Sequence, residues 1–597
     1  MVRNLFCKSV KNFVRLKFEN KVVLITGSGT GIGMTVAKKF VESGASVIIL
    51  GRRKEPLEST SEMLTKIINE KNSNGFVKIF SGVDVSDENA ITEMFDALKN
   101  EGVNVDIVVN NAGVSGPVTC FAHAPLEDFR STVDIHLTGT FWTSVQALKV
   151  MKEGAKIITI STFFAEERPL EQRPYRFRGP YTASQGAKNR LVEAMSWELT
   201  EKGIVSIGTN PGPVHSDRIY KTVYPKAASE FLRVSGSEEL IPTEVEIVNK
   251  EILGLLGEDE ETIKNGIKAA AEKLGKQEST LTNLLNKVQS IAEKIQKNTS
   301  TMIPDQQFLS QDQVATTILT LADDDQAKIL NGKIIPGDRV FYPVRSHITS
   351  IPETVKQHDY SSKIAVLTID ATDEEDAKRA EEIAANIESN GGQAICFISD
   401  KCSKEVQDSI TNKFHSHVID FSKNEEITRW FNTAKSKGDI EVFIHITGKV
   451  PNISRLTELS RKEWDGLTNK FINIPATVSQ NAMNIFVPNG SDDPRLFKDA
   501  TGRIVIIGPD LPYGKKIGGG ERAKVEVFRG ALRPFATTVN QELSDVLKSN
   551  VRVFLVLAGA VDGKEPNNAR ITDAVNYSIS NDSKSSAEVI FCPDESR

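Results

Sequence analysis

Residues 22–33 read VVLITGSGTGIG, and this segment is the strongest indication of the fold in the chain. The apolar run over 22–26 is typical of a buried strand, and the glycines that follow it allow a tight turn into a helix that begins near residue 32. Such a turn lets backbone N–H groups approach a pyrophosphate at the helix N-terminus. A strand, a glycine-rich loop and a helix in this order predict a dinucleotide-binding βαβ unit.

Short apolar runs and helical patterns alternate after this unit. The helical patterns include 32–43 and 187–201. The runs between the helices are nearly continuous in apolar residues, as expected for strands that are covered on both faces of a parallel sheet. Further strands are therefore expected at 46–50, 77–82, 106–110, 156–161 and 205–209.

The same pattern recurs in the second half of the chain. The segment IEVFIHITG (440–448) matches VDIVVNNAG (105–113), and TGRIVIIG (501–508) matches GAKIITIS (154–161). Such an internal duplication predicts an α/β chain of two fused Rossmann-like domains, each a doubly wound parallel sheet. The second sheet is expected to use strands at 363–370, 393–399, 441–446, 503–508 and 552–557. The expected divisions are an N-terminal arm (1–20), a first domain (21–345), a linker (346–362) and a second domain (363–597).

One segment of the first half, about 218–310, has no counterpart in the second half. Leu281, Leu285 and Val288 in this segment recur at spacings of three and four, which predicts amphipathic helices. The acidic run 258–261 precedes one of these patterns, where carboxylates suit a helix N-terminus. We expect a helical insertion, either a hairpin that stiffens the domain pair or a lid over a large substrate.

Composition excludes several classes of protein. The 597 residues include 73 Lys and Arg against 79 Asp and Glu, and the net charge is −6. This balance argues against a nucleic-acid partner or an anionic membrane surface, and no apolar run is long enough to span a bilayer. Five scattered cysteines without CxxC spacing predict neither a disulfide framework nor a zinc site, and they favour a cytoplasmic location.

The end of the second expected strand indicates which cofactor is bound. NAD-binding proteins commonly place a carboxylate there for the ribose hydroxyls. This chain instead has Arg52 and Arg53, and guanidinium groups pair well with a 2′-phosphate. We therefore predict NADPH as the cofactor, the alternative being that these arginines only cap a surface strand.

Several motifs in order resemble the short-chain dehydrogenase/reductase family. The glycine spacing Gly27-x-x-x-Gly31-x-Gly33 is followed by Asp84-Val85 and by an Asn-Asn-Ala-Gly turn at 110–113. The resemblance implies that the following residues, with Arg52 and Arg53, bind the cofactor: Thr26, Gly27, Ser28, Gly29, Thr30, Gly31, Ile32, Gly33, Asp84, Val85, Asn111, Ala112, Gly113, Pro211, Gly212 and Val214.

The family resemblance also implies the catalytic residues. The family uses a serine after the fifth strand, a tyrosine that donates a proton to the carbonyl, and a lysine four residues later that makes the tyrosine more acidic. Ser161 and Tyr181 match, but Gln185 occupies the lysine position, and His136 stands where the family has a helix asparagine. Lys188 is the candidate substitute, because seven residues turn a helix by about 700° and return it to nearly the same face. Arg176 and Arg178 are other nearby cations.

A second resemblance covers the whole chain. The segment NPGPVHSDRI (210–219) is similar to the PGP-x-x-S-(D/E)-R-I stretch of bacterial malonyl-CoA reductase, and STFF (161–164) is similar to its Ser-Thr-Ile-Phe. Each half of that bifunctional enzyme is a tandem of two short-chain dehydrogenase domains, the second of them degenerate. The resemblance implies that Arg218, and with it Phe163, contacts the substrate, since a guanidinium group binds a carboxylate well.

By this resemblance the chain is an NADPH-dependent reductase of a small carboxylated acyl-CoA or semialdehyde. The leading reaction reduces malonyl-CoA to malonate semialdehyde. The first alternative reduces malonate semialdehyde to 3-hydroxypropionate, chemistry that serves carbon fixation. The second alternative is a cofactor-binding pseudoenzyme or scaffold, because Gln185 and His136 depart from the family pattern.

The second half is expected to be chemically silent. Its first turn lacks glycines, Gly508 stands at the position of Ser161, and Val525 stands at the position of Tyr181. His415 and His417 lack nearby acidic or cysteine partners, so no metal site is expected. We expect the second domain to replace a missing subunit beside the active site, and the whole chain to be able to form a homodimer.

Overall fold

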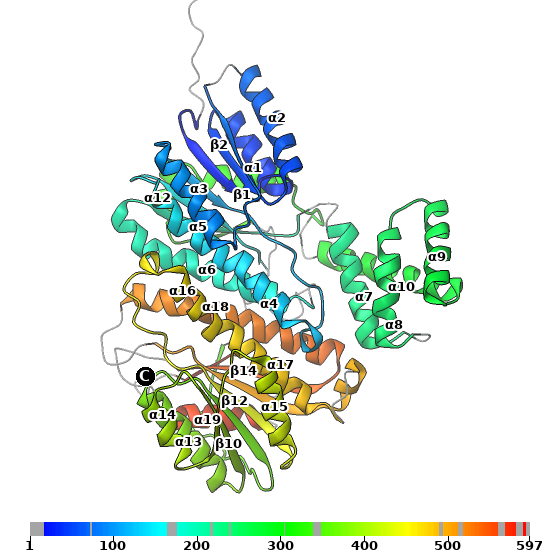
Figure 1. Cartoon of the computed structure of the whole chain (residues 1–597), viewed down its shortest axis with the longest axis vertical. Coiled ribbons are helices and arrows are strands. Elements are labelled where there is room, and N and C mark those ends of the chain that lie inside the picture. Colours follow the sequence, from blue (N-terminus) through cyan, green and yellow to red (C-terminus); the bar gives the residue numbers. More distant parts are fainter. Residues whose placement is uncertain are drawn as a thin grey trace, which may run out of the picture.

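The computed structural model describes residues 17–71, 74–163, 176–214, 219–237, 240–301, 303, 305–337, 348–488, 493–511, 518–558, 567–580 and 589–592. Two parallel sheets, one from each half of the chain, lie toward opposite ends of the long axis, with helices packed between them (Figure 1). The fold class predicted from the sequence is confirmed.

The first sheet has the strand order β3-β2-β1-β4-β5-β6-β7, and every pairing in it is parallel. Successive strands are added toward one edge of the sheet from β1 to β3 and toward the other edge from β4 to β7. The boundary between β1 and β4 is therefore the switch point where doubly wound sheets bind ligands. Its strands are β1 (Val22–Thr26), β2 (Ser46–Gly51), β3 (Val77–Ser81), β4 (Ile107–Asn110), β5 (Lys156–Ile160), β6 (Val205–Pro211) and β7 (Ile334–Gly337).

Helices cover both faces of the first sheet. One core cluster joins the sheet to α1, α2 and α11, and another joins its opposite face to α3, α5 and α6. The helices of this half are α1 (Gly31–Glu42), α2 (Lys54–Glu70), α3 (Glu88–Asn100), α4 (Leu126–Val133), α5 (Gly139–Ala147), α6 (Gly179–Leu199), α11 (Gln311–Leu321) and α12 (Asp324–Ile329).

The predicted insertion forms four helices that project to one side of the molecule (Figure 1). They are α7 (Tyr224–Ser235), α8 (Pro242–Ile252), α9 (Glu260–Leu274) and α10 (Glu278–Ser300). Leu281, Leu285 and Val288 lie in a core that belongs to these helices, as their spacing predicts. Asp259, in the acidic run, caps α9 by accepting a hydrogen bond from the Thr262 N–H at 2.9 Å.

The second sheet has the order β11-β10-β9-β12-β13-β14-β15-β8. Its strands are β8 (Ile348–Ser350), β9 (Ile364–Ile369), β10 (Gln393–Ser399), β11 (His415–Ile419), β12 (Ile440–Ile446), β13 (Thr501–Ile507), β14 (Asn550–Ala558) and β15 (Val589–Cys592). Its helices are α13 (Glu374–Ser389), α14 (Lys404–Thr411), α15 (Asn424–Lys435), α16 (Arg461–Thr468), α17 (Ile474–Phe486), α18 (Gly519–Gln541) and α19 (Asn568–Ile579).

The two halves meet along α6 and α18, which pack against each other. Gly186 and Gly530 lie at the crossing, and a Cβ added at Gly186 would overlap the Gly530 carbonyl oxygen. Small residues allow the two backbones to approach this closely. One continuous apolar cluster therefore runs from the first sheet through α6 and α18 to the second sheet.

Four strands were not predicted from the sequence: β7, β8, β11 and β15. Three of them, β7, β8 and β11, are edge strands, and β15 lies next to the edge strand β8. β8 falls within the segment expected to link the halves, so part of that segment belongs to the second sheet. In the described part of the chain no helix is long and apolar enough to cross a membrane, and the four described cysteines are free.

Candidate active site

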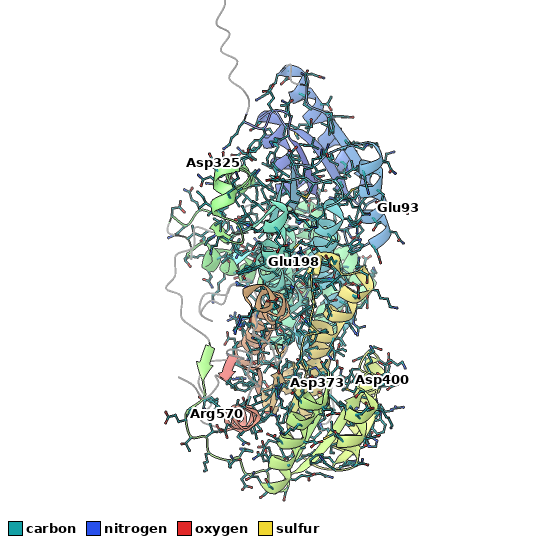
Figure 2. All side chains as sticks on the ribbon, turned by 90° about the vertical axis from the view of Figure 1, so that its left-hand side faces the viewer. Glu93, Glu198, Asp325, Asp373, Asp400 and Arg570 are labelled. Atoms are coloured by element: carbon teal, nitrogen blue, oxygen red, sulfur yellow. The ribbon has the colours of Figure 1, made fainter. Side chains whose placement is uncertain are left out.

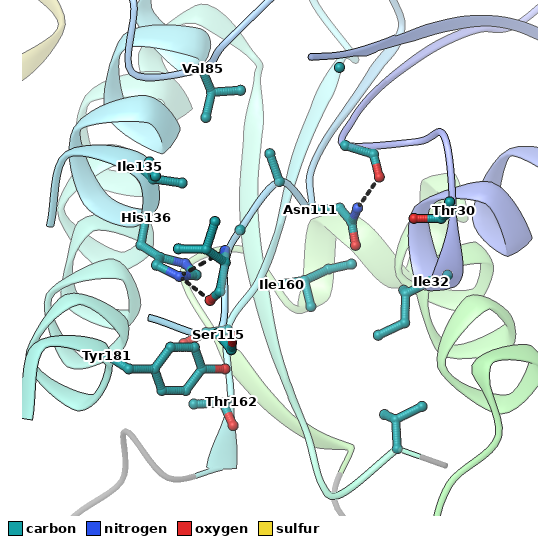
Figure 3. A pocket seen from close by; sticks show the side chains of 18 of the residues that line it. Thr30, Ile32, Val85, Asn111, Ser115, Ile135, His136, Ile160, Thr162 and Tyr181 are labelled. Carbon is teal, nitrogen blue, oxygen red and sulfur yellow. Dashed lines mark hydrogen bonds between the residues drawn. The ribbon is translucent and has the colours of Figure 1, made fainter. Parts of the chain in front are cut away.

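A cavity of about 850 Å³ lies at the carboxyl ends of the strands of the first sheet. The loops that follow β1 to β6 all contribute to its wall, together with α6 and residues at the start of the helical insertion. Figure 3 shows the glycine loop with Thr30 and Ile32 on one side, and His136 and Tyr181 on the other. The cavity is therefore at the ligand-binding position of a doubly wound sheet.

The glycine loop fits the pyrophosphate of a dinucleotide. Gly27 and Gly31 have φ angles of 64° and 63°, which side chains other than glycine rarely adopt. Both residues line the cavity. The first turn of α1 holds no acidic residue, and its N-cap Thr30 makes no side-chain capping bond. The positive end of the α1 dipole thus faces the cavity, and no acidic side chain in the first turn of α1 neutralises it.

Asn111 fastens the loop from behind. Its side-chain amide donates to the carbonyls of Thr26 (2.9 Å) and Gly27 (3.1 Å), and its backbone N–H donates to Thr26 Oγ1 at 2.9 Å. A Cβ at Gly33 would lie 2.5 Å from the Asn111 amide nitrogen. Thr26, Ser28 and Gly33 are therefore placed behind the loop, where they shape it, and not on the cavity wall itself.

The other residues expected to bind the cofactor do line the cavity. Arg52 lies 3.5 Å from Asp84, measured from Nη1 to Oδ2, and Arg53 is at the N-cap position of α2, where its side chain makes no capping bond. Both guanidinium groups belong to one end of the cavity, after β2. The full set on the wall is Gly27, Gly29, Thr30, Gly31, Ile32, Arg52, Arg53, Asp84, Val85, Asn111, Ala112, Gly113, Pro211, Gly212 and Val214.

The expected catalytic residues Ser161, Tyr181, Gln185, Lys188 and His136 share this cavity. Tyr181 projects from the first turn of α6 toward Ser115 and Thr162 (Figure 3). Ser161 directly follows β5, and its hydroxyl donates to the backbone carbonyl of Gln185 at 3.2 Å. The Tyr181 hydroxyl, which can donate a proton, and the Ser161 hydroxyl thus border the same cavity. Reduction of a carbonyl group requires such a proton donor.

His136 and Gln185 form one hydrogen-bonded unit. His136 Nε2 lies 2.8 Å from the Val114 carbonyl oxygen, and Nδ1 lies 3.1 Å from the Gln185 side-chain nitrogen. An amide nitrogen can only donate, so Nδ1 accepts from Gln185, and the 2.8 Å contact then makes Nε2 the donor to the Val114 carbonyl; the Val114 N–H also lies 3.3 Å from Nε2. Gly113 leaves room for the ring, since a Cβ there would lie 2.5 Å from its Cε1 atom. His136 therefore orients the amide of Gln185.

The comparisons with known proteins agree with this geometry. A family model described as short chain dehydrogenase matches residues 21–224. The 3alpha-hydroxysteroid dehydrogenase of Mediterraneibacter gnavus is 32% identical over 209 residues, which are 35% of this chain and 78% of that protein. The chain belongs to the short-chain dehydrogenase family. An NADPH-dependent aldehyde reductase-like protein of Arabidopsis thaliana is 28% identical over 243 residues, 38% of this chain and 87% of that protein.

Two solved structures are similar over nearly the whole chain. The C-domain of bacterial malonyl-CoA reductase, solved with NADP, covers 97% of this chain and 99% of its own, with a TM-score of 0.75 and 17% identity. The N-domain of bacterial malonyl-CoA reductase, also with NADP, gives a TM-score of 0.68 at 15% identity. At these identities the likeness shows the fold alone: two doubly wound domains in tandem.

Lys188, one of the cations considered for the missing family lysine, is buried at the cavity wall. Its ammonium group donates to the carbonyl of Ile160, the residue before Ser161, at 2.7 Å. Burial lowers the pKa of Lys188 to about 7 from the ordinary 10.5. The group is thus near its titration point at neutral pH.

This pKa predicts a pH-dependent stability that Lys188→Met removes. In the folded protein the amine is neutral above about pH 7, while in the unfolded chain it stays protonated up to about 10.5. The unfolded state binds the extra proton in this window, so wild-type stability relative to the variant rises with pH, by up to about 1.4 kcal/mol per pH unit. Urea unfolding at about pH 7 and pH 9 measures this difference. The exposed Lys202→Met is the control, and equal pH dependence in all three proteins would contradict the burial of Lys188.

Arg178 provides a second cation in the short-chain dehydrogenase site. Its guanidinium carbon lies 4.1 Å from the centre of the Tyr181 ring, and the side chain is buried. A cation this close to an aromatic face interacts favourably with it. The sequence indicated Arg178 only as one of several nearby charges, because the pattern gives no distance to Tyr181.

Of the two residues expected to contact substrate, Arg218 lies outside the described residues. Phe163 is buried in the protein and is not on the described cavity wall. The structure adds wall residues that sequence reasoning missed, among them Gln311 at the start of α11. Ile219 and Val223, at the start of the helical insertion, also line the cavity. Gln311 carries no motif, so no sequence signal could have found it.

The second domain fills the equivalent position with its own carboxylates. α13 follows β9 as α1 follows β1, but its first turn contains three acidic residues. Asp376 Oδ2 accepts hydrogen bonds from the backbone N–H groups of Thr372 (2.9 Å) and Lys449 (3.2 Å). Asp373 caps the same helix. The donors that a pyrophosphate would use are therefore already satisfied.

Proposed function

We propose that the chain is an NADPH-dependent reductase of a small carboxylated acyl-CoA or semialdehyde, with malonyl-CoA as the first substrate to test. The observation that carries the proposal is the shared cavity. It places Ser161 and Tyr181 on a wall that also includes an anion-binding glycine loop and two arginines. The 210–219 motif and the whole-chain likeness to both domains of malonyl-CoA reductase support this substrate class.

The residues of the chain divide the work as follows. NADPH, held by the glycine loop with Arg52 and Arg53 at its 2′-phosphate, would supply the hydride. Tyr181 donates the proton that the carbonyl oxygen acquires, and the Ser161 hydroxyl holds that oxygen. With malonyl-CoA the product of this addition is a hemithioacetal, whose C–S bond then breaks so that CoA leaves as the thiol and the semialdehyde remains. Gln185, oriented by His136, offers an amide to the bound molecules. Arg178 and Lys188 supply positive charge near the tyrosine and the serine, respectively.

The direct test follows NADPH consumption by the purified chain with malonyl-CoA and, separately, with malonate semialdehyde. Turnover with malonyl-CoA supports the leading reaction. Turnover with only the semialdehyde would reassign the step to formation of 3-hydroxypropionate. NADPH binding without turnover on either substrate would contradict the reductase and favour the pseudoenzyme.

The cofactor preference has its own test in the double variant Arg52→Ala/Arg53→Ala. Losing two charge-assisted hydrogen bonds to a 2′-phosphate should reduce the preference for NADPH over NADH by about ten- to a hundredfold. The ratio of kcat/KM for the two cofactors measures the effect. Lys54→Ala, one residue further along and not on the described cavity wall, is the matched control. An unchanged ratio in the double variant would refute the 2′-phosphate assignment.

A further inference from the structure

A carboxyl group of the second domain reaches into the first domain beside the active site. Glu542 follows the last residue of α18 and is almost fully buried. Its two oxygens accept hydrogen bonds from backbone N–H groups of two different first-domain segments: Oε2 from Phe121 at 2.7 Å and Oε1 from Phe177 at 2.9 Å. These are contacts between domains, made by one side chain.

Phe177 needs to be held in place. Its φ angle is 66°, in the left-handed region that residues with a side chain rarely occupy, and a conformation of this kind persists only when its surroundings fix it. The side chain is buried, the N–H donates to Glu542, and the carbonyl accepts from the Thr119 N–H at 3.2 Å. Glu542 therefore holds the N–H group of Phe177, and Thr119 holds its carbonyl group.

The next residue is Arg178, which forms the N-cap of α6. Its carbonyl accepts from the Thr182 N–H at 2.9 Å, so its backbone is tied to the helix on one side and to Phe177 on the other. From this position its guanidinium group lies over the Tyr181 ring. A shift in Phe177 would move the arginine relative to the tyrosine.

We propose that Glu542 is a positioning residue for the active site of the first domain: through Phe177 it seats Arg178 against Tyr181. This inference rests on the proposed function, in which Tyr181 is the proton donor. A cation over the ring stabilises the negative charge that develops on the tyrosine as its proton leaves. The second domain then completes the active site, although its own cofactor position is filled.

The cost of burying this carboxyl group agrees with a specific role. Burial raises the pKa of Glu542 to about 8 from the ordinary 4.5, while the N–H groups of Phe121 and Phe177 lower it. Neighbouring groups include Cys120 and Glu230. The two N–H donors thus offset part of the electrostatic cost of burying this carboxyl group.

The pseudo-twofold arrangement supplies a matched control. Trp197-Glu198-Leu199 at the end of α6 corresponds to Gln541-Glu542-Leu543 at the end of α18. Glu198 accepts from the backbone N–H groups of Leu456 (2.6 Å) and Thr457 (3.0 Å) in the second domain. Figure 2 shows Glu198 near the middle of the molecule, where the domains meet. Neither Leu456 nor Thr457 adjoins a residue of the described cavity wall, so Glu198 makes the same kind of contact away from the active site.

The experiment compares Glu542→Leu with Glu198→Leu in the full chain, by steady-state kinetics and by hydrogen–deuterium exchange over residues 176–181. Each variant removes a buried acceptor of two N–H groups. We expect Glu542→Leu alone to lower kcat by about ten- to a hundredfold, with the KM for NADPH within about twofold of wild type. We also expect only this variant to exchange about tenfold faster at 176–178.

Equal kcat losses in the two variants, or unchanged exchange at 176–178 in Glu542→Leu, would overturn the proposal. If Glu542→Leu does not fold, Glu542→Gln replaces it, because an amide still accepts one of the two bonds and a partial effect on both readouts is expected. If the wild-type chain consumes no NADPH, that result counts against the proposed function, and the exchange at 176–178 alone decides the positioning role.

Discussion

Tyr181→Phe should abolish measurable reduction by this chain while leaving NADPH binding intact. The change removes only the hydroxyl that we assign as the proton donor, and loss of a general acid typically lowers kcat by about a hundred- to ten-thousandfold. The ring stays, so its contact with Arg178 and its edge-to-face contact with His136 remain. The measurement is kcat under saturating NADPH, together with the dissociation constant for NADPH.

Two features of the result distinguish catalysis from damage to the fold. The variant should keep the wild-type thermal midpoint, because phenylalanine fills the space of the tyrosine ring. Tyr220→Phe, at a tyrosine of the insertion that is not on the described cavity wall, serves as the control and should retain turnover. A Tyr181→Phe protein with wild-type kcat would remove Tyr181 from the mechanism.

Gly186→Ala should separate the two domains, and it has the largest stability effect that we expect. The added methyl group would overlap the Gly530 carbonyl oxygen and would lie 2.7 Å from Pro534 Cγ, because the two helices are in close contact here. Overpacking at backbone contacts of this kind costs about 3 kcal/mol or more. This cost exceeds the roughly 1 kcal/mol that alanine gains over glycine in a helix. Because α6 also carries Tyr181, Gln185 and Lys188, activity should fall with stability.

The control for this variant is Gly466→Ala in α16, where an added Cβ meets nothing within 4 Å. It should leave the urea midpoint unchanged or raise it slightly. Gly186→Ala should lower the midpoint and split the unfolding curve if the domains lose their common core. A Gly186→Ala protein as stable as wild type would mean that α6 and α18 do not cross at these glycines.

Much of the fold follows from the sequence because the central strands are covered on both faces. β1 and β10 begin and end at the predicted residues, since each is a continuous apolar run. β11 reads HSHVI, three polar residues followed by only two apolar ones, and β7 contains Pro336. Edge strands like these lack the apolar run on which the prediction depends.

The candidate site was predictable where it consists of loops that follow strands. Arg52, Asp84 and Tyr181 were placed by motif, and the structure brings them to one cavity. Gln311 and Glu542 were beyond prediction, because they reach the site or its border from segments distant in sequence. A glutamate at the end of a helix gives no sign in the sequence of the backbone N–H groups that it accepts from.

We expect one domain to bind the cofactor and the other to complete the site without binding it. Isothermal titration of the intact chain with NADPH distinguishes these roles. One NADPH should bind per chain, because Asp373 and Asp376 occupy the helix N-terminus of the second domain. Binding of two NADPH molecules per chain, or of none, would contradict it.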